Sequence, residues 1–162
     1  MKKREELVVA KPLSLRLYWE GEKLARMRLT WAAKGEEPRI ETKIGHELAK
    51  TLARYVLGKT VQWPKLPIDL DALPLFHQKV LKELMRVPAG QVVSYKGLAM
   101  ASGSPQAARA VGQVMAKNRW PLIFPCHRVL TSSGKVGGFG PGPDMKRWLL
   151  ELEGISPQAI KG

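Results

Sequence analysis

The sequence predicts an α+β protein: a small N-terminal α/β domain that contains a β-hairpin, joined to a mostly helical C-terminal domain. Apolar and polar residues alternate before position 31, apolar residues recur at helical spacing after position 75, and a proline-rich segment separates the two patterns. We therefore expect domains at 1–65 and 75–162 and a linker at 66–74. With 162 residues, 44% of them apolar and 25% charged, the chain can bury a core of ordinary size.

The N-terminal half begins with two alternating segments. Residues 13–18 and 24–31 each alternate between apolar and polar side chains, and the turn sequence Glu-Gly-Glu-Lys lies between them at 20–23. This arrangement predicts an antiparallel hairpin. A helix is expected over 45–57, because apolar residues recur there at helical spacing and a glycine follows the last turn.

The C-terminal half opens with two predicted helices. Apolar residues from Phe76 to Met85 fall on one face of a helix over 75–85. A turn sequence, Pro-Ala-Gly, then ends this helix. Ser94 is a typical N-cap for a second helix over 95–101.

A third predicted helix carries one long side chain among small ones. Ser104 and Pro105 supply a cap and a first-turn proline for a helix over 106–115, in which Arg109 stands among alanines. Two short helices joined by a glycine turn are typical of a helix-turn-helix, whose second helix enters a nucleic-acid groove. The alternative is a helix packed on its neighbour, with Arg109 reaching to water.

Charge points to a polyanionic partner. The net charge is +13, and the stretch from Leu84 to Pro143 contains no Asp or Glu. An acid-free basic surface suits phosphates. The alternative is a basic excess that serves solubility or heat stability.

The chain start and the cysteine content favour a cytoplasmic protein. The first residues are charged, unlike a signal peptide, and no run of 18 apolar residues could span a membrane. Cys126 is the only cysteine, so internal disulfides are excluded and no metal site is expected. The glycines of 136–143 match no nucleotide-binding motif, and no cofactor is expected.

Cys126 is the candidate nucleophile. A thiol needs a base or a positive charge nearby to form a thiolate at neutral pH, and His127 follows directly. On a strand these side chains would point to opposite faces, so His127 could reach the sulfur only through a local turn or a water. Glu151 or Glu153, in a last helix expected over 145–153, could complete a thiol–imidazole–carboxylate relay. The alternative is an inert, buried cysteine.

The C-terminal half resembles the O6-alkylguanine-DNA alkyltransferases, also called methylated-DNA–protein-cysteine methyltransferases. The resemblance covers 76–154 and centres on Pro-Cys-His-Arg-Val at 125–129. Further matching segments are Val93–Tyr95, Leu98–Ala99, Ala107–Gly112, Met115, Asn118, Ser132–Gly134, Val136–Gly137, Lys146, Trp148–Leu150 and Glu153–Gly154. The resemblance implies a ribonuclease-H-like N-terminal domain and a helix-turn-helix in the C-terminal domain.

The resemblance also implies an activity. The protein would bind duplex DNA as a monomer through the minor groove, rotate O6-alkylguanine out of the stack, and transfer the alkyl group irreversibly to Cys126. O4-alkylthymine would be a further substrate. Each chain would act once, without a cofactor.

Residue roles follow from the same resemblance. His127 would act as base through a water, Glu153 would orient that imidazole, and Tyr95 would donate a proton to the leaving guanine. Asn118 would brace the turn before the cysteine, and Arg109 would fill the gap left by the extruded base. The remaining DNA contacts would be Ala107, Ala108, Gly112 and Ser132. The guanine pocket would comprise Met115, Val129, Val136, Gly137, Phe139, Gly140 and Lys146.

Two departures from the family pattern concern the pocket. Phe139 stands where the family frequently has tyrosine, and Pro141 and Pro143 stiffen a loop that is usually richer in glycine.

Two other functions compete with repair. One is a non-catalytic relative that lacks the cysteine, against which Cys126 argues; the other is a helix-turn-helix regulator with a structural thiol.

Overall fold

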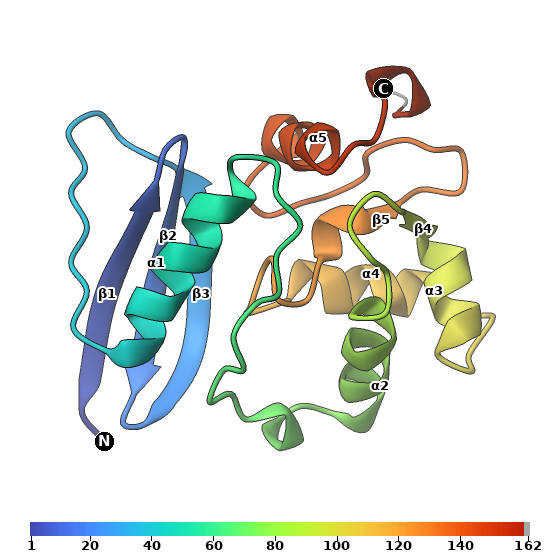
Figure 1. The fold of residues 1–162 in the computed structure, drawn as a ribbon. Helices are drawn as coiled ribbons and strands as arrows, with labels where there is room; N and C mark the ends of the chain where they lie inside the picture. The colour runs from blue at the N-terminus through green and yellow to red at the C-terminus, as the bar shows by residue number, and fades with distance from the viewer. Residues whose placement is uncertain (161–162) are drawn as a thin grey trace. The chain divides into compact units, whose positions relative to one another are not determined.

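The computed structural model describes residues 1–160 and has the predicted mixed α+β composition (Figure 1). It forms two compact units, Met1–Asp69 and Leu70–Gly162. The boundary falls inside the proline-rich segment at 66–74. No helix in the described part of the chain is long and apolar enough to cross a membrane.

The first unit is a three-stranded antiparallel sheet with a helix against one face (Figure 1). Strands β2 (Leu13–Glu20) and β3 (Lys23–Trp31) form the predicted hairpin. Strand β1 (Lys3–Ala10) pairs with β2 on its other side and was not predicted. Its sequence, Lys-Arg-Glu-Glu-Leu-Val-Val-Ala, hides the alternation because the buried position 6 is a glutamate.

Helix α1 (Lys43–Tyr55) begins two residues before the predicted start because Thr42 caps it. The Thr42 hydroxyl accepts a hydrogen bond from the amide of Gly45 at 2.9 Å. Beneath this cap lies the fully buried carboxylate of Glu6. It accepts hydrogen bonds from Trp19 Nε1 at 2.7 Å, from the Thr42 hydroxyl at 2.7 Å and from the Thr42 amide at 2.8 Å. One buried acid thereby joins β1, β2 and the start of α1.

The second unit is mostly helical, as predicted. Its helices are α2 (Leu75–Leu84), α3 (Tyr95–Ala101), α4 (Ala108–Ala116) and α5 (Pro143–Leu152), with short 3-10 helices η1 (Leu70–Ala72), η2 (Cys126–Arg128) and η3 (Pro157–Ala159). Two-residue strands β4 (Val93–Ser94) and β5 (Val129–Leu130) pair in parallel. These strands are too short to leave a pattern in the sequence. They hold the start of α3 beside the segment that follows Cys126.

Three local predictions are wrong in detail. Helix α4 begins two residues late, because the Ala107 amide donates to the carbonyl of Ser104 at 2.9 Å and so places Pro105 in a turn before the helix. Met85 lies outside α2 and is 54% exposed, so it does not share the buried face. The buried side of α5 is formed by Met145, Lys146, Leu149 and Leu150, whereas Trp148 and Leu152 are half-buried.

Candidate active site

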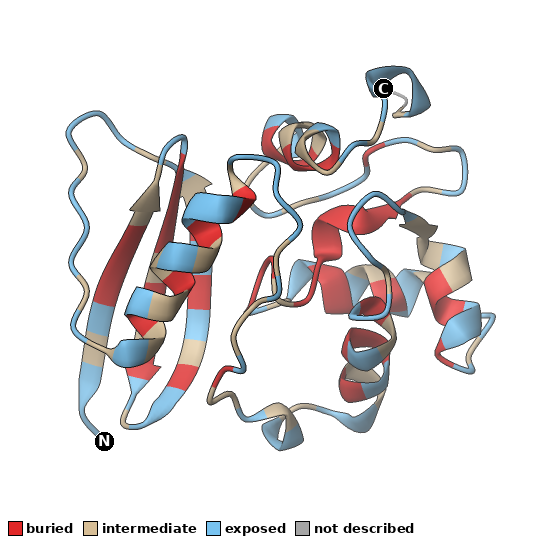
Figure 2. Cartoon of the chain, in the orientation of Figure 1, coloured by how far each residue is buried: buried red, intermediate tan, exposed pale blue. Residues whose placement is uncertain are grey.

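Cys126 lies on the single turn of 3-10 helix η2, not on a strand. The amide of Cys126 donates to the Phe124 carbonyl at 2.7 Å, and the Arg128 amide donates to the Pro125 carbonyl at 2.9 Å. This is the local turn that would let neighbouring side chains cooperate. Figure 2 shows the turn and the following strand β5 as buried throughout, and Cys126 itself is 7% exposed.

The side chain of His127 meets a carboxylate at the end of α5. Its Nε2 lies 2.8 Å from Oε2 of Glu153, and the two side chains are 1% and 2% exposed. Glu151 is exposed, so the acid of the possible relay is Glu153. Because Nε2 donates to this carboxylate, the lone pair of a neutral ring lies on Nδ1. Nδ1 is buried and has no hydrogen-bond partner within residues 1–160.

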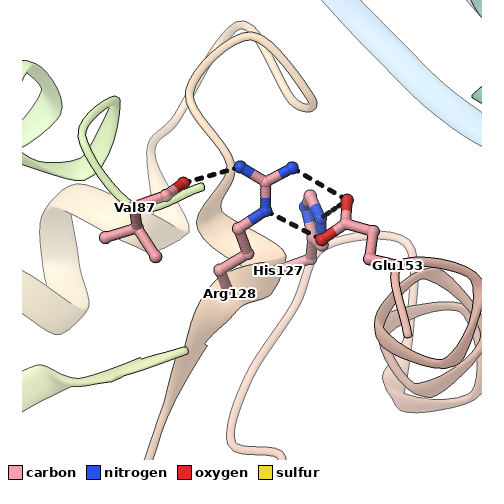
Figure 3. A network of polar contacts seen from close by, with 4 residues as sticks. All are labelled: Val87, His127, Arg128 and Glu153. Atoms are coloured by element: carbon pink, nitrogen blue, oxygen red, sulfur yellow. Dashed lines mark hydrogen bonds and ion pairs between the residues drawn. The ribbon is translucent and has the colours of Figure 1, made fainter. Parts of the chain in front are cut away.

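Arg128 binds the same carboxylate, a contact that the sequence analysis missed (Figure 3). Its Nε donates to Glu153 Oε1 at 2.8 Å and its Nη2 donates to Oε2 at 2.9 Å. The remaining amine, Nη1, donates to the carbonyl oxygen of Val87 at 2.7 Å. In the sequence, Arg128 counts only as one more positive charge. One signal was available in the sequence: no acid lies near Arg128 along the chain, so a carboxylate partner for it has to come from a distant segment.

Burial and pairing set the charges of this triad. Burial alone would raise the pKa of Glu153, but hydrogen bonds from His127 and Arg128 overcome it and hold the pKa at about 2. Burial lowers the pKa of His127; the contact with Glu153 opposes this, while the charges of Arg128 and Lys146 add to it. At neutral pH the carboxylate is therefore ionised and the imidazole neutral.

The thiol is held protonated at rest. Burial raises the pKa of Cys126, and the Asn118 side chain and the charge of Lys146 oppose that rise. Asn118 also connects the end of α4 to the approach to η2: its Nδ2 donates to the Phe124 carbonyl at 2.8 Å, and its Oδ1 accepts from the Trp120 amide at 3.1 Å. A protonated thiol has to lose its proton before it can attack as a nucleophile.

Tyr95 stands at the first position of α3, after the Ser94 cap. Burial raises the pKa of Tyr95, so its hydroxyl keeps its proton at neutral pH. The segment after β5 passes close to this ring: a Cβ on Gly137, whose φ is +72°, would lie 3.0 Å from the hydroxyl oxygen. Only glycine fits this approach without strain.

Lys146 is a fully buried cation on α5. Its Nζ donates to the Gly138 carbonyl at 3.2 Å and lies 5.9 Å from the centroid of the Tyr95 ring. Burial lowers the pKa of Lys146 to about 8, and Cys126 acts in the opposite direction. While charged, this ammonium group favours the thiolate of Cys126.

The other predicted site residues fall into two groups. Met115, Val129 and Val136 are buried, and Phe139 lies edge-on to the His127 ring with 6.4 Å between centroids. The positions predicted to touch DNA are Arg109 and Ser132, both exposed, and Ala107, Ala108 and Gly112, all half-buried; Gly140 is exposed on the glycine-rich segment. The structure thus gathers Cys126 with groups from η2, α3 and α5, and leaves Arg109 projecting from α4.

The family model and the most similar relatives found for this chain have closely related descriptions. Residues 75–155 match the family described as 6-O-methylguanine DNA methyltransferase, DNA binding domain. The methylated-DNA–protein-cysteine methyltransferase of Saccharolobus islandicus (strain M.16.27) is 43% identical over 109 residues, 67% of this chain and 69% of that protein. The protein of the same name from Metallosphaera sedula is 40% identical over 119 residues, 74% of each chain.

Solved structures show the same likeness over most of the chain. The crystal structure of Mycobacterium tuberculosis OGT in complex with DNA matches with a TM-score of 0.75 and 30% identity, covering 96% of this chain and 94% of that one. The O6-methylguanine-DNA methyltransferase of Pyrococcus kodakaraensis matches with a TM-score of 0.68 over 93% of this chain and 98% of its own. At 21% identity, this second likeness concerns the fold.

Proposed function

This chain belongs to the 6-O-methylguanine DNA methyltransferase family, and we propose that it repairs duplex DNA by moving the alkyl group of O6-alkylguanine to Cys126. The family and the enzyme class predicted from the sequence, a methylated-DNA–protein-cysteine methyltransferase, are confirmed. The observation that carries the proposal is the buried arrangement of Cys126, His127 and Glu153. Each chain acts once, as a monomer.

The transfer begins with removal of the thiol proton. His127 is neutral, and its free lone pair lies on the buried Nδ1, so the imidazole accepts this proton through a bridging water. Glu153, ionised and bonded to Nε2, stabilises the imidazolium that forms. The charge of Lys146 stabilises the thiolate, a soft nucleophile suited to attack at an alkyl carbon.

Displacement then exchanges one bond for another. The Cys126 sulfur forms a bond to the alkyl carbon, the bond from that carbon to O6 breaks, and its electron pair passes to the guanine. Tyr95 donates its hydroxyl proton to the base, because burial keeps the phenol protonated at rest. The imidazolium holds the thiol proton that can restore the phenol. The thioether has no good leaving group, which accounts for one turnover per chain.

Helices α3 and α4 supply the DNA-binding surface as a helix-turn-helix. Arg109 is exposed near the start of α4, and the residues on either side of it, Ala108 and Ala110, have short side chains. The surrounding stretch from Leu84 to Pro143 is free of acids and suits a phosphate backbone. In this proposal Arg109 fills the space of the extruded base and offsets part of the cost of unstacking, a few kcal/mol.

Intact-mass measurement tests the transfer. The protein is incubated with a duplex carrying O6-methylguanine, and the same experiment is run with Cys126→Ala. We expect a stable gain of one methyl group in the unaltered chain and none in the variant. A helix-turn-helix regulator with a structural thiol would gain no mass in either case, and that result would overturn the proposal.

A further inference from the structure

We propose that Arg128 is a positioning residue for the alkyl transfer: its guanidinium group fixes the Glu153 carboxylate and, through it, the orientation and protonation state of His127. This inference rests on the proposed function and adds a residue that acts on the base without touching the sulfur. It concerns a triad that the turn at η2 makes possible, since His127 and Arg128 are consecutive and reach the same carboxylate.

The contact has the geometry of a fork. Nε and Nη2 of Arg128 bond the two oxygens of Glu153 at 2.8 and 2.9 Å, which fixes the plane of the carboxylate. Oε2 accepts from His127 as well, so the plane of the carboxylate determines where Nε2 is held. Lysine has a point charge and cannot reproduce both bonds in one plane.

The third bond anchors the fork to another element. Nη1 of Arg128 donates at 2.7 Å to the carbonyl of Val87, in the turn that follows α2. Glu153 is the C-terminal cap of α5, and a helix end without such an anchor is free to fray. Arg128 therefore connects the Glu153 carboxylate to η2 and to the turn that follows α2, and both connections help to orient the imidazole.

Charge gives Arg128 a second effect on the same base. The charged groups that act on the pKa of His127 are Lys146 on α5, Glu153 at the end of α5 and Arg128 on η2; Phe139 adds an apolar ring edge. Of these, Glu153 favours the imidazolium, whereas Arg128 and Lys146 disfavour it. The positive charge of Arg128 balances the negative charge of the Glu153 carboxylate, so Glu153 stays ionised although it is buried. His127 meanwhile stays neutral and able to accept a proton.

A purely structural ion pair is the competing account. Buried ion pairs often add little net stability, yet removal of one partner destabilises the fold because it strands the other charge. Loss of stability in an Arg128 variant would therefore not separate the two accounts. The pH dependence of the reaction does separate them, because a structural role alters the amount of active protein without altering the pKa of the base.

The test compares Arg128→Met and Arg128→Lys with Arg147→Met as control. Arg147 lies on α5, where it forms a surface ion pair with Asp144 at 3.7 Å. The rate of methyl transfer from an O6-methylguanine duplex is measured against pH and divided by the amount of titratable active protein. The pH dependence of Cys126 alkylation by iodoacetamide is measured in parallel, since it needs no DNA.

We expect Arg128→Met to slow transfer per active molecule by about 10- to 100-fold, by analogy with the loss of a partner that orients a metal-binding histidine. The acid limb of both pH profiles should move to higher pH, because a charge that lowers the pKa of His127 is gone. Arg128→Lys, which keeps the charge but cannot form both bonds in one plane, should be slowed with a smaller pH shift. Arg147→Met should match the unaltered protein.

Two results would overturn the assignment of Arg128: a rate per active molecule within twofold of the unaltered protein in both variants, or pH profiles that do not move. If Arg128→Met does not fold, the rate of Arg128→Lys per active molecule decides, because lysine keeps the charge but cannot form both bonds of the fork. A rate within twofold of the unaltered protein would then overturn the assignment. Failure of the unaltered protein to transfer methyl would instead refute the proposed function. In that case the iodoacetamide profiles still report whether Arg128 acts on the base beside Cys126.

Discussion

Each unit of the molecule contains one deeply buried glutamate, and the two are used differently. Glu6, in the first unit, accepts hydrogen bonds from backbone amides, a hydroxyl and an indole, none of which changes its charge near neutral pH. Glu153, in the second unit, bonds an imidazole and a guanidinium group. Both carboxyls have a lowered pKa despite burial.

The difference shows how partners decide what a buried carboxylate does. Donors with a fixed charge turn Glu6 into a joint between two strands and the start of α1. In the proposed reaction, an imidazole partner that can gain and lose a proton makes Glu153 a part of proton transfer. Burial and a lowered pKa alone would not distinguish the two, so the chemistry of the donors is the informative observation.

The largest expected effect is on the rate of methyl transfer, which should depend on Glu153 and not on Glu6. Glu153→Gln should slow methyl transfer per active molecule by about 100-fold, because a neutral amide no longer stabilises the imidazolium. Single-turnover kinetics on an O6-methylguanine duplex measure this rate. Glu151→Gln, an exposed neighbour on the same helix, is the control and should retain full activity. A rate unchanged in Glu153→Gln would remove that residue from the mechanism.

Glu6→Gln should show the opposite behaviour. Its amide group would face donors that need an acceptor, which costs roughly 2–4 kcal/mol of unfolding free energy. The rate of transfer per folded molecule should stay the same. Urea denaturation followed by tryptophan fluorescence measures the loss, with Glu5→Gln, exposed on the same strand, as control. Equal stability of the two variants would contradict the role of Glu6.

Arg109→Ala sharpens the comparison from the exposed side of the second unit. Its effect should depend on the substrate: about 10-fold or more slower on duplex DNA, where a base must leave the stack, and little change on free O6-alkylguanine. Lys50→Ala, which removes an exposed charge from α1, is the control. Equal losses on both substrates would mean that Arg109 does not act on the stack.

A fall in pH should lower the free energy of unfolding in two stages. Burial lowers the pKa of His127 below 6.5, so the folded chain binds this proton less readily than the unfolded chain, and stability should decline as the pH falls below 6.5. Glu6 and Glu153 have pKa values below the ordinary 4.5, so their contributions to stability are complete above that pH and are lost below it, for Glu153 between about 4.5 and about 2. Urea denaturation at a series of pH values measures both stages. A free energy of unfolding that stays constant between pH 6.5 and pH 4.5 would contradict the lowered pKa of His127.

Sequence patterns foretold the parts of the structure that depend on local chemistry. The hairpin of β2 and β3 and the Ser94 cap followed from alternation and capping. Spacing left Glu151 and Glu153 as alternatives, and only the resemblance to a family selected Glu153. Strand β1 was not predicted, because Glu6 occupies a buried position at which an alternating strand would have an apolar residue. Met85 was misplaced because periodicity does not show where a helix ends.

The fork of Arg128 lay beyond sequence reasoning for a physical reason. Its partners, Glu153 and the carbonyl of Val87, are separated from it by 25 and 41 positions, and only the folded chain brings them together. The resemblance to a family predicted Cys126 as the nucleophile and His127 as its base. It did not show that one carboxylate binds both the imidazole of His127 and the guanidinium group of Arg128.

The stoichiometry of repair tests the central claim most directly. A fixed amount of protein is titrated with excess O6-methylguanine duplex, restored guanine is counted, and the modified peptide is identified by mass spectrometry. We predict a plateau at one guanine restored per chain, with the methyl group on the peptide that contains Cys126. A count that keeps rising with time, or a methyl group on any other residue, would contradict the account.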